Sequence, residues 1–205
     1  MTVAHVEILV EEPSAEAALQ ILLPKILGDT TFAVHASTCK DALLKGLPKL
    51  LRGYASWLPD DWRIVVVVDR DADNCSELKG NLEAMAARAG LTSKSKAKNK
   101  RFTVINRLAV EELEAWYFGD WEAVRRAYPR VNHSVPTQAK YRSPDEIKGG
   151  TWEAFERVLK VSGYFRTGLR KIEAARAVAW HMDPNVNTSP SFCTLRDALA
   201  TLVTA

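Results

Sequence analysis

Acidic residues follow a strongly hydrophobic segment near the middle of the chain. Residues 64–68 are five consecutive β-branched residues, and Asp69, Asp71 and Asp73 come directly after them. Such a segment is typical of a strand buried on both faces, and ligands of open α/β sheets collect at the carboxyl ends of the strands. Three neighbouring carboxylates repel one another, and a hard divalent cation is the simplest counter-charge. The segment therefore predicts a metal site, although an Asp-rich turn that caps the next helix explains Asp71 and Asp73 equally simply.

Two further predicted strands also end in acidic residues. Glu11 and Glu12 follow the strand expected over residues 3–10. The acidic residues after the strand expected over residues 102–105 are Glu111, Glu112 and Glu114. Acids in a first helical turn favour the helix dipole in any protein, and Glu12 has a simple interpretation as a solvated turn residue. Three strand ends that all carry carboxylates nevertheless favour metal binding at one edge of a parallel sheet.

Short β-rich segments alternate with helical patterns over the first 120 residues. This alternation predicts βα units and therefore an α/β fold, with a mostly parallel sheet of about four strands flanked by helices. The expected strands are residues 3–10, 31–36, 64–68 and 102–105. The expected helices are residues 14–27, 41–57 with an interruption at Pro48, 76–88 and 110–118.

After Pro129 the pattern changes. Residues 133–150 are rich in Pro, Ser, Thr, Gly and charged residues, as loops are. The helices expected beyond them are residues 151–160, 168–181 and 195–203, with no strand between them. We therefore expect an α/β core over residues 1–128 and a helical C-terminal extension over residues 129–205 that packs on the core.

The composition is that of an ordinary globular protein, with 205 residues, 47% hydrophobic residues, 26% charged residues and a net charge of +3. No apolar run approaches the roughly 20 residues that a membrane span requires, and no signal peptide is visible at the N-terminus. Cys39, Cys75 and Cys193 are odd in number and widely spaced, which fits reduced thiols better than disulfides or a zinc site. These features predict a cytoplasmic protein without a membrane segment.

Spacing excludes three other motifs that bind metals or phosphate. An EF-hand loop that begins at Asp69 would require Gly at its sixth position and Glu at its twelfth, where the chain has Asn74 and Gly80. A phosphatase of the haloacid dehalogenase type would continue D-x-D with Gly and Thr or Val, where the chain has Ala72 and Asp73. No G-x-x-x-x-G-K sequence of a P-loop occurs.

Several segments together resemble a bacterial Toprim-like family of unknown function. They are residues 9–16 (LVEEPSAE), 67–71 (VVDRD), 109–116 (AVEELEAW), 171–176 (KIEAAR) and 189–192 (SPSF), so the resemblance covers most of the chain. The family is related to the overcoming-lysogenisation-defect nucleases, and its members often sit in phage-defence or mobile-element loci. Topoisomerases and primases share the Toprim domain. The resemblance implies a Toprim/Rossmann-like sheet for the first part of the chain.

The resemblance also assigns functions to individual positions. It implies catalytic roles for Glu11, Asp69 and Asp71. The positions that it implies as ligands of Mg²⁺ or Mn²⁺ are Glu11, Asp69, Asp71, Asp73, Glu111 and Glu112, with the last two as alternatives for one ligand. Many Toprim domains have Gly where this chain has Glu12, which adds negative charge to the predicted site.

Basic residues gather in two segments. The first comprises Lys94, Lys96, Lys98, Lys100 and Arg101, and the second comprises Arg170, Lys171 and Arg176. Flexible cationic side chains give salt-dependent contacts to phosphates that do not depend on nucleic-acid sequence. Both segments are therefore predicted to bind nucleic acid, although a solvated loop explains the first segment equally simply.

The leading hypothesis is a Mg²⁺-dependent enzyme that hydrolyses phosphodiester bonds, a nuclease acting on DNA or RNA within a bacterial defence system. The chain contains no ATPase motif, so any energy-coupled activity would need a partner protein, and the family resemblance implies a separately encoded ATPase as that partner. Two alternatives remain. One is a non-catalytic effector or interaction module of a two-protein defence complex, and the other is a small-molecule phosphohydrolase that uses the same carboxylates.

Overall fold

The computed structural model describes residues 3–98 and 101–203. It confirms the α/β class and the sheet of four parallel strands. The strands are β1 (His5–Val10), β2 (Thr31–Ala36), β3 (Trp62–Asp69) and β4 (Val104–Ala109), which pair in the order β2-β1-β3-β4. The first helices are α1 (Pro13–Leu27), α2 (Lys40–Trp57) and α3 (Cys75–Arg88). The later helices are α4 (Glu114–Gly119), α5 (Trp121–Ala127), α6 (Thr151–Val161), α7 (Lys171–His181) and α8 (Pro190–Val203), with short 3-10 turns η1 (Val135–Thr137) and η2 (Pro144–Glu146).

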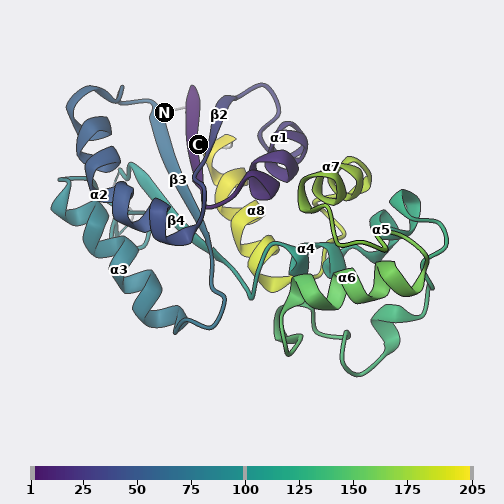
Figure 1. Ribbon diagram of the computed structural model, residues 1–205. Coiled ribbons are helices and arrows are strands. Elements are labelled where there is room, and N and C mark those ends of the chain that lie inside the picture. The colour runs from purple at the N-terminus through teal and green to yellow at the C-terminus, as the bar shows by residue number, and fades with distance from the viewer. Residues whose placement is uncertain (1–2, 99–100, 204–205) are drawn as a thin grey trace.

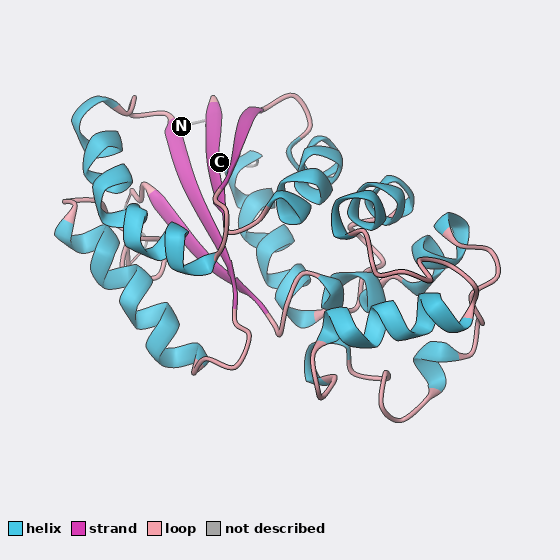
Figure 2. Ribbon diagram, in the orientation of Figure 1, coloured by secondary structure: helices cyan, strands magenta, loops and turns pink. Residues whose placement is uncertain are grey.

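Helices cover both faces of the sheet, as the cyan ribbons beside the magenta strands of Figure 2 show. Ile64, Val66 and Val68 of β3 belong to the hydrophobic core beneath α2 and α3. The alternate residues Val65 and Val67 belong to the core beneath α1 and α8. Side chains of a strand alternate between the two faces of its sheet. The unbroken β-branched run of β3 therefore reflects a strand that is buried on both sides.

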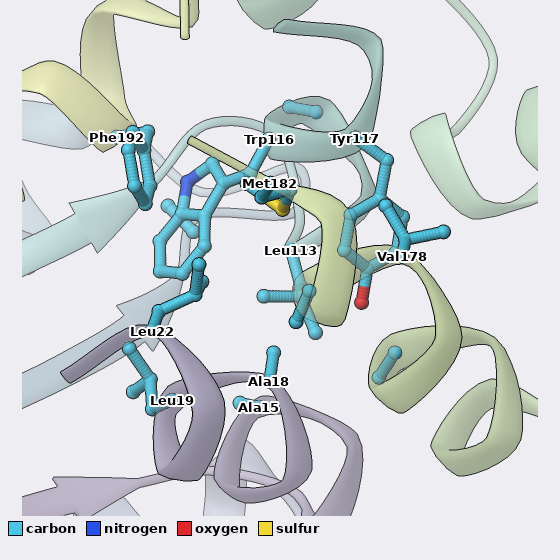
Figure 3. Packing of buried hydrophobic residues seen from close by; sticks show 14 of the residues in the cluster. Ala15, Ala18, Leu19, Leu22, Leu113, Trp116, Tyr117, Val178, Met182 and Phe192 are labelled. Carbon is cyan, nitrogen blue, oxygen red and sulfur yellow. The ribbon is translucent and has the colours of Figure 1, made fainter. Parts of the chain in front are cut away.

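The C-terminal helices share one continuous core with the sheet. In Figure 1, α7 lies against α1, and α8 lies against both α1 and β4. The side chains that meet at the centre of this core, labelled in Figure 3, are Ala15, Ala18, Leu19, Leu22, Leu113, Trp116, Tyr117, Val178, Met182 and Phe192. The rings of Trp116 and Phe192 pack edge to face, with centroids 5.3 Å apart. Residues on both sides of position 128 thus contribute to the same hydrophobic core.

A single lysine connects α1 to the end of α7. Lys25 Nζ donates hydrogen bonds to the backbone oxygens of Ala179, Trp180 and Met182, at 3.0, 2.9 and 2.7 Å. These carbonyl groups lie at a helix C-terminus, where orphan acceptors and the helix dipole both favour a cation. The contact orients α7 along α1, so that the beginning of α7 lies near the beginning of α1.

The boundaries of β4 and of the helix that follows it differ from those expected. β4 extends over residues 104–109 instead of 102–105, and polar Asn106 and Arg107 lie within it. β4 is an edge strand, and edge strands carry charged residues that apolar periodicity does not detect. The next helix begins at Glu114 rather than at residue 110. The backbone oxygens of Ala109 and Glu111 accept hydrogen bonds from the loop after β3, which keeps this segment extended.

Three helices also differ from expectation. α2 continues through Pro48, and α5 was not expected. Asp120 separates α4 from α5 because its Oδ1 accepts from the N–H of Ala123, which caps α5. α8 begins at Pro190, five residues before the expected start, and the hydroxyl of Ser189 accepts a hydrogen bond from the N–H of Phe192.

Among the described residues, no helix combines the length and the apolar character that crossing a membrane requires.

Candidate functional site

Glu11 and Asp69 are brought into contact by the pairing of β1 with β3. Val10 is in register with Val67, so Glu11, which follows β1, and Asp69, the last residue of β3, lie near each other at the carboxyl edge of the sheet. The backbone N–H of Asp69 donates a hydrogen bond to Glu11 Oε2 at 3.1 Å. Both side chains are buried, with relative exposures of 9% for Glu11 and 6% for Asp69. Two of the three residues with predicted catalytic roles are therefore neighbours.

The surroundings of Glu11 and Asp69 disfavour a negative charge on either side chain. Burial raises the pKa of Glu11 to about 7. Burial also raises the pKa of Asp69 well above its usual range, and the charges of Glu11 and Glu114 raise it further. No hydrogen bond to the side-chain oxygens of Asp69 is found among the described residues. Desolvation and like-charge repulsion both disfavour the ionised form, and a cation bound at the pair would relieve both.

Among the glutamates that follow β4, Glu114 is the one whose charge raises the pKa of Asp69. It lies in the first turn of α4 and is only 1% exposed. Burial raises its pKa to about 7, and the side-chain Oε2 atom has no hydrogen-bond partner among the described residues. The sequence left Glu111 and Glu112 as alternatives for a ligand from this strand. Glu114 is the most deeply buried of these three glutamates.

Glu111 and Glu112 have other contacts. The Glu111 carboxylate lies 3.9 Å from a guanidinium nitrogen of Arg70. Glu112 Oε2 accepts hydrogen bonds from the hydroxyl of Thr151 and the N–H of Trp152, both at 2.9 Å. Glu112 thereby satisfies an orphan donor at the beginning of α6. These contacts give Glu111 an ionic partner and Glu112 a structural role at a helix N-terminus.

Asp71 and Asp73 bind the ammonium group of Lys40. Lys40 Nζ lies 2.9 Å from Asp71 Oδ2 and 2.7 Å from Asp73 Oδ2. Lys40 is the first residue of α2, the helix that follows β2, so its contact with the loop after β3 depends on the folded sheet. The two aspartates proposed from the sequence as metal ligands therefore have a protein cation as their partner.

A second lysine and a buried tyrosine lie at the acidic edge, the name used from here on for the carboxyl edge of the sheet with Glu11, Glu12, Asp69, Asp71, Asp73 and Glu114. Lys171 Nζ lies 3.6 Å from Glu12 Oε2, and the charges of Glu114 and Glu12 outweigh burial and raise the pKa of Lys171. The hydroxyl of Tyr117 is buried, with no hydrogen-bond partner among the described residues. Burial raises the pKa of Tyr117 well above its usual range, and Glu114 raises it further. Sequence reasoning missed Lys40 and Tyr117, because no motif marks them. It named Glu114 among the acidic residues after the strand expected over residues 102–105 but did not choose it as a ligand.

The donor atoms of this edge suit magnesium. Among the described residues, no group of three or more His, Cys, Asp or Glu side chains is placed so that it could hold a metal ion. Mg²⁺, however, usually keeps several water ligands and is bound through only one or two carboxylates together with substrate phosphates. Glu11 and Asp69 supply two adjacent carboxylates, and Glu114 has a buried oxygen without a partner. The residues present therefore fit a Mg²⁺ ion that is bound in this way.

The basic segment before β4 lies away from the acidic edge. The residues of this segment that the structure describes are Lys94, Lys96, Lys98 and Arg101, and Lys100 lies outside the described residues. Arg101 Nη1 forms an ion pair with Asp60, which precedes β3, at 3.1 Å. The segment therefore lies at the amino edge of the parallel sheet. The length of a strand, roughly 20 Å, separates it from Asp69 at the carboxyl edge.

The second basic group lies close to the acidic edge. Arg170, Lys171 and Arg176 line an open groove of about 940 Å³, with Ile21 of α1 and Trp180 of α7 among the other lining residues. The ring of Trp180 is 71% exposed. Because Lys171 also contacts Glu12, the groove begins beside the carboxylates. Of the two predicted basic groups, this is the one that has a residue, Lys171, in contact with the acidic residues in the part of the chain that the structure describes.

The pH dependence of stability tests the buried carboxylates. Glu114 has an ordinary pKa of 4.5 that rises to about 7 in the folded protein. Between these values the folded state binds more protons than the unfolded state, so stability falls as the pH rises. Without metal, we expect the free energy of unfolding to fall between pH 5 and pH 8 by on the order of 3 kcal/mol for this group. Urea denaturation in EDTA at both pH values measures the change.

The Glu114→Gln variant is the control for this pH dependence. It removes one titrating group and should make the profile less steep by that group's share, while Glu11, whose pKa is also raised to about 7, continues to titrate. Added Mg²⁺ should restore stability at pH 8, where the carboxylates are ionised and free to bind a cation. A wild-type profile that is flat, or as steep in Glu114→Gln as in the wild type, contradicts the expected titration.

The comparisons with known proteins identify the family of the chain. Searches of curated proteins and of solved structures found no match. A family model matches residues 10–200, which include Glu11, Asp69, Glu114 and both lysines of the acidic edge. Since the match covers most of the chain, the protein belongs to the family described as a domain of unknown function, DUF4276.

Proposed function

We propose that the protein is a Mg²⁺-dependent enzyme that hydrolyses phosphodiester bonds of nucleic acid. The observation that carries this proposal is the buried contact between Glu11 and Asp69, beside Glu114, at the carboxyl edge of a parallel sheet. Burying carboxylates without a counter-charge costs stability, and a divalent cation would offset that cost. Ligands of open α/β sheets also bind at this edge. The location and the charge of the pair therefore support a catalytic metal.

Glu11 and Asp69 would hold the ion. When bound, Mg²⁺ would polarise a phosphate oxygen and lower the pKa of a bound water molecule. The chain itself supplies a proton carrier, because Glu114 has a pKa of about 7 and exchanges its proton near neutral pH. Burial of the pair limits access of bulk water, which strengthens electrostatic interactions at the site. The arrangement thus combines a position for a cation with an adjacent acid–base group.

The groove beside the site favours nucleic acid as the substrate. Arg170 and Arg176 offer cationic contacts to phosphates along the groove, and Lys171 stands between the groove and the carboxylates. The exposed ring of Trp180 provides a flat surface on which a base can stack. A small phosphate ester would need neither the length of the groove nor the aromatic ring. In the cell, the Toprim-like resemblance supports a role in bacterial defence with a separately encoded ATPase.

A cleavage assay tests the proposal. Purified protein is incubated with single-stranded DNA, double-stranded DNA and RNA in Mg²⁺, in Mn²⁺ and in EDTA. We expect cleavage only with metal, and a fall of roughly 100-fold or more in the Glu11→Gln variant, which removes one ligand charge. The matched control is Glu146→Gln, because Glu146 is an exposed carboxylate on η2. That variant should cleave as fast as the wild type.

Two outcomes would contradict the proposal. Cleavage that persists in Glu11→Gln would place the reaction elsewhere. A wild-type protein that neither cleaves nor gains thermal stability with Mg²⁺ or Mn²⁺ would instead support a non-catalytic interaction module.

A further inference from the structure

Lys40 is surrounded by oxygen atoms in the way that a bound cation is. Its Nζ atom lies 2.9 Å from the backbone oxygen of Arg70, 2.9 Å from Asp71 Oδ2 and 2.7 Å from Asp73 Oδ2. An ammonium group has three donors, and these three oxygens accept all of them. Only 14% of the Lys40 side chain is exposed. Two carboxylates and a backbone carbonyl are also the kinds of ligand that hard divalent cations take.

The oxygens around Lys40 are held in place by the backbone of the loop after β3. The N–H groups of Arg70 and Asp71 donate to the backbone oxygens of Ala109 and Glu111, both at 2.9 Å, and the N–H of Asp73 donates to the oxygen of Arg70 at 3.0 Å. Asp71 adopts a left-handed conformation with a φ angle of 49°, which Asp tolerates better than most residues. These bonds fix the loop backbone, so the Arg70 carbonyl and the positions from which the two aspartate side chains extend should stay in place when the lysine side chain is removed.

We propose that Lys40 takes the place of a second metal ion at the carboxyl edge of the sheet. In this arrangement the protein binds one divalent cation, at Glu11 and Asp69, and Lys40 supplies a second positive charge that is part of the chain. The inference rests on the proposed function, because it concerns the same edge. It assigns Asp71 and Asp73 to the lysine rather than to the metal.

The electrostatics agree with this assignment. Burial lowers the pKa of Lys40, but its hydrogen bonds to Asp73 and Asp71 outweigh burial and raise it, so the group stays charged. Burial raises the pKa of Glu11, one of the two proposed metal ligands, and the charge of Lys40 opposes that rise. A fixed ammonium group at the same edge of the sheet adds positive potential where a phosphate would bind, so a second ion is not needed.

The number of bound metal ions tests the inference. We expect a Mn²⁺ titration, followed by the electron paramagnetic resonance of free Mn²⁺, to give one ion per chain for the wild type. The Lys40→Gln variant should bind two ions, because removal of the ammonium frees two carboxylates and a carbonyl oxygen. Lys40→Arg should retain one ion, as should the control Lys45→Gln, which changes an exposed lysine of the same helix.

A second measurement does not depend on how the Lys40 variants fold. The double variant Asp71→Asn/Asp73→Asn keeps Lys40, and we expect its affinity for Mn²⁺ to stay within about threefold of the wild type, whereas loss of a true ligand costs roughly 10-fold or more. A larger loss in the double variant overturns the inference, as does one ion in Lys40→Gln or two in the wild type, while the proposed function stands. No ion in the wild type overturns both.

Discussion

The Gly119→Ala variant is expected to lose about 3 kcal/mol or more of stability, although alanine favours helices more than glycine does. Gly119 is the last residue of α4, where a Cβ atom would overlap Asn187 Oδ1 and lie 2.7 Å from the backbone N of Ser189. The Asn187 side chain cannot retreat easily, because it donates to the Trp116 oxygen and accepts from the Ser189 N–H. The variant must therefore separate α4 from the segment before α8.

Gly80→Ala is the matched control for this prediction. Gly80 lies within α3, and a Cβ atom there would meet nothing within 4 Å. We expect this variant to gain up to about 1 kcal/mol, because alanine loses less backbone entropy on folding. Urea denaturation of both variants, monitored by circular dichroism, measures the two changes. Equal stabilities for Gly119→Ala and the wild type would show that the contact between α4 and Asn187 is not close.

The Asp69→Asn variant is expected to abolish metal-dependent activity and at the same time to stabilise the metal-free protein. Asp69 is buried beside Glu11, and burial and repulsion disfavour its charge. Asparagine has nearly the same shape without the charge, so the metal-free fold should gain on the order of 1 kcal/mol at pH 8. The same change removes a ligand charge, which should slow cleavage roughly 100-fold or more and remove the stabilisation by Mg²⁺.

Asp60→Asn provides the comparison for Asp69→Asn. Asp60 precedes β3 at the opposite edge of the sheet, and its side chain is 86% exposed. We expect this variant to keep both cleavage and the shift in melting temperature with Mg²⁺. Thermal denaturation with EDTA and with Mg²⁺ separates the two effects of Asp69→Asn. If that variant were less stable than the wild type without metal, or still stabilised by Mg²⁺, Asp69 would not be the charged ligand that we propose.

The strands that are buried on both faces were the easiest to predict from the sequence. Five consecutive β-branched residues, 64–68, indicate β3, and Asp69, the last residue of the strand, comes directly after them. β4 was misplaced by a few residues because Asn106 and Arg107 lie within it, and an edge strand tolerates such residues. α8 could have been predicted more accurately. Ser189 followed by Pro190 is a typical helix start, with a capping side chain and a proline at the first helical position.

The contacts of the candidate site were harder to predict, because they join residues that are distant in sequence. The contact of Glu11 with Asp69 follows from strand order, which parallel βα units favour. The partnership of Lys40 with Asp71 and Asp73 depends on how α2 returns to the sheet, and no local pattern encodes it. The sequence did not distinguish Glu114 from the neighbouring Glu111 and Glu112. Its burial in the first turn of α4 and its electrostatic effect on Asp69 depend on the folded structure and have no local sequence pattern.

The position of α8 has a consequence for biosynthesis. Ile105 of β4 and Val65 and Val67 of β3 share a core with Phe192 and Leu199 of α8, which the ribosome synthesises after both strands. While the chain is being translated, these sheet residues lack the helix that will shield them from water. Nascent polypeptides with uncovered β-branched surface are prone to aggregate and to recruit chaperones. The sheet should therefore acquire its final packing only after α8 has left the exit tunnel.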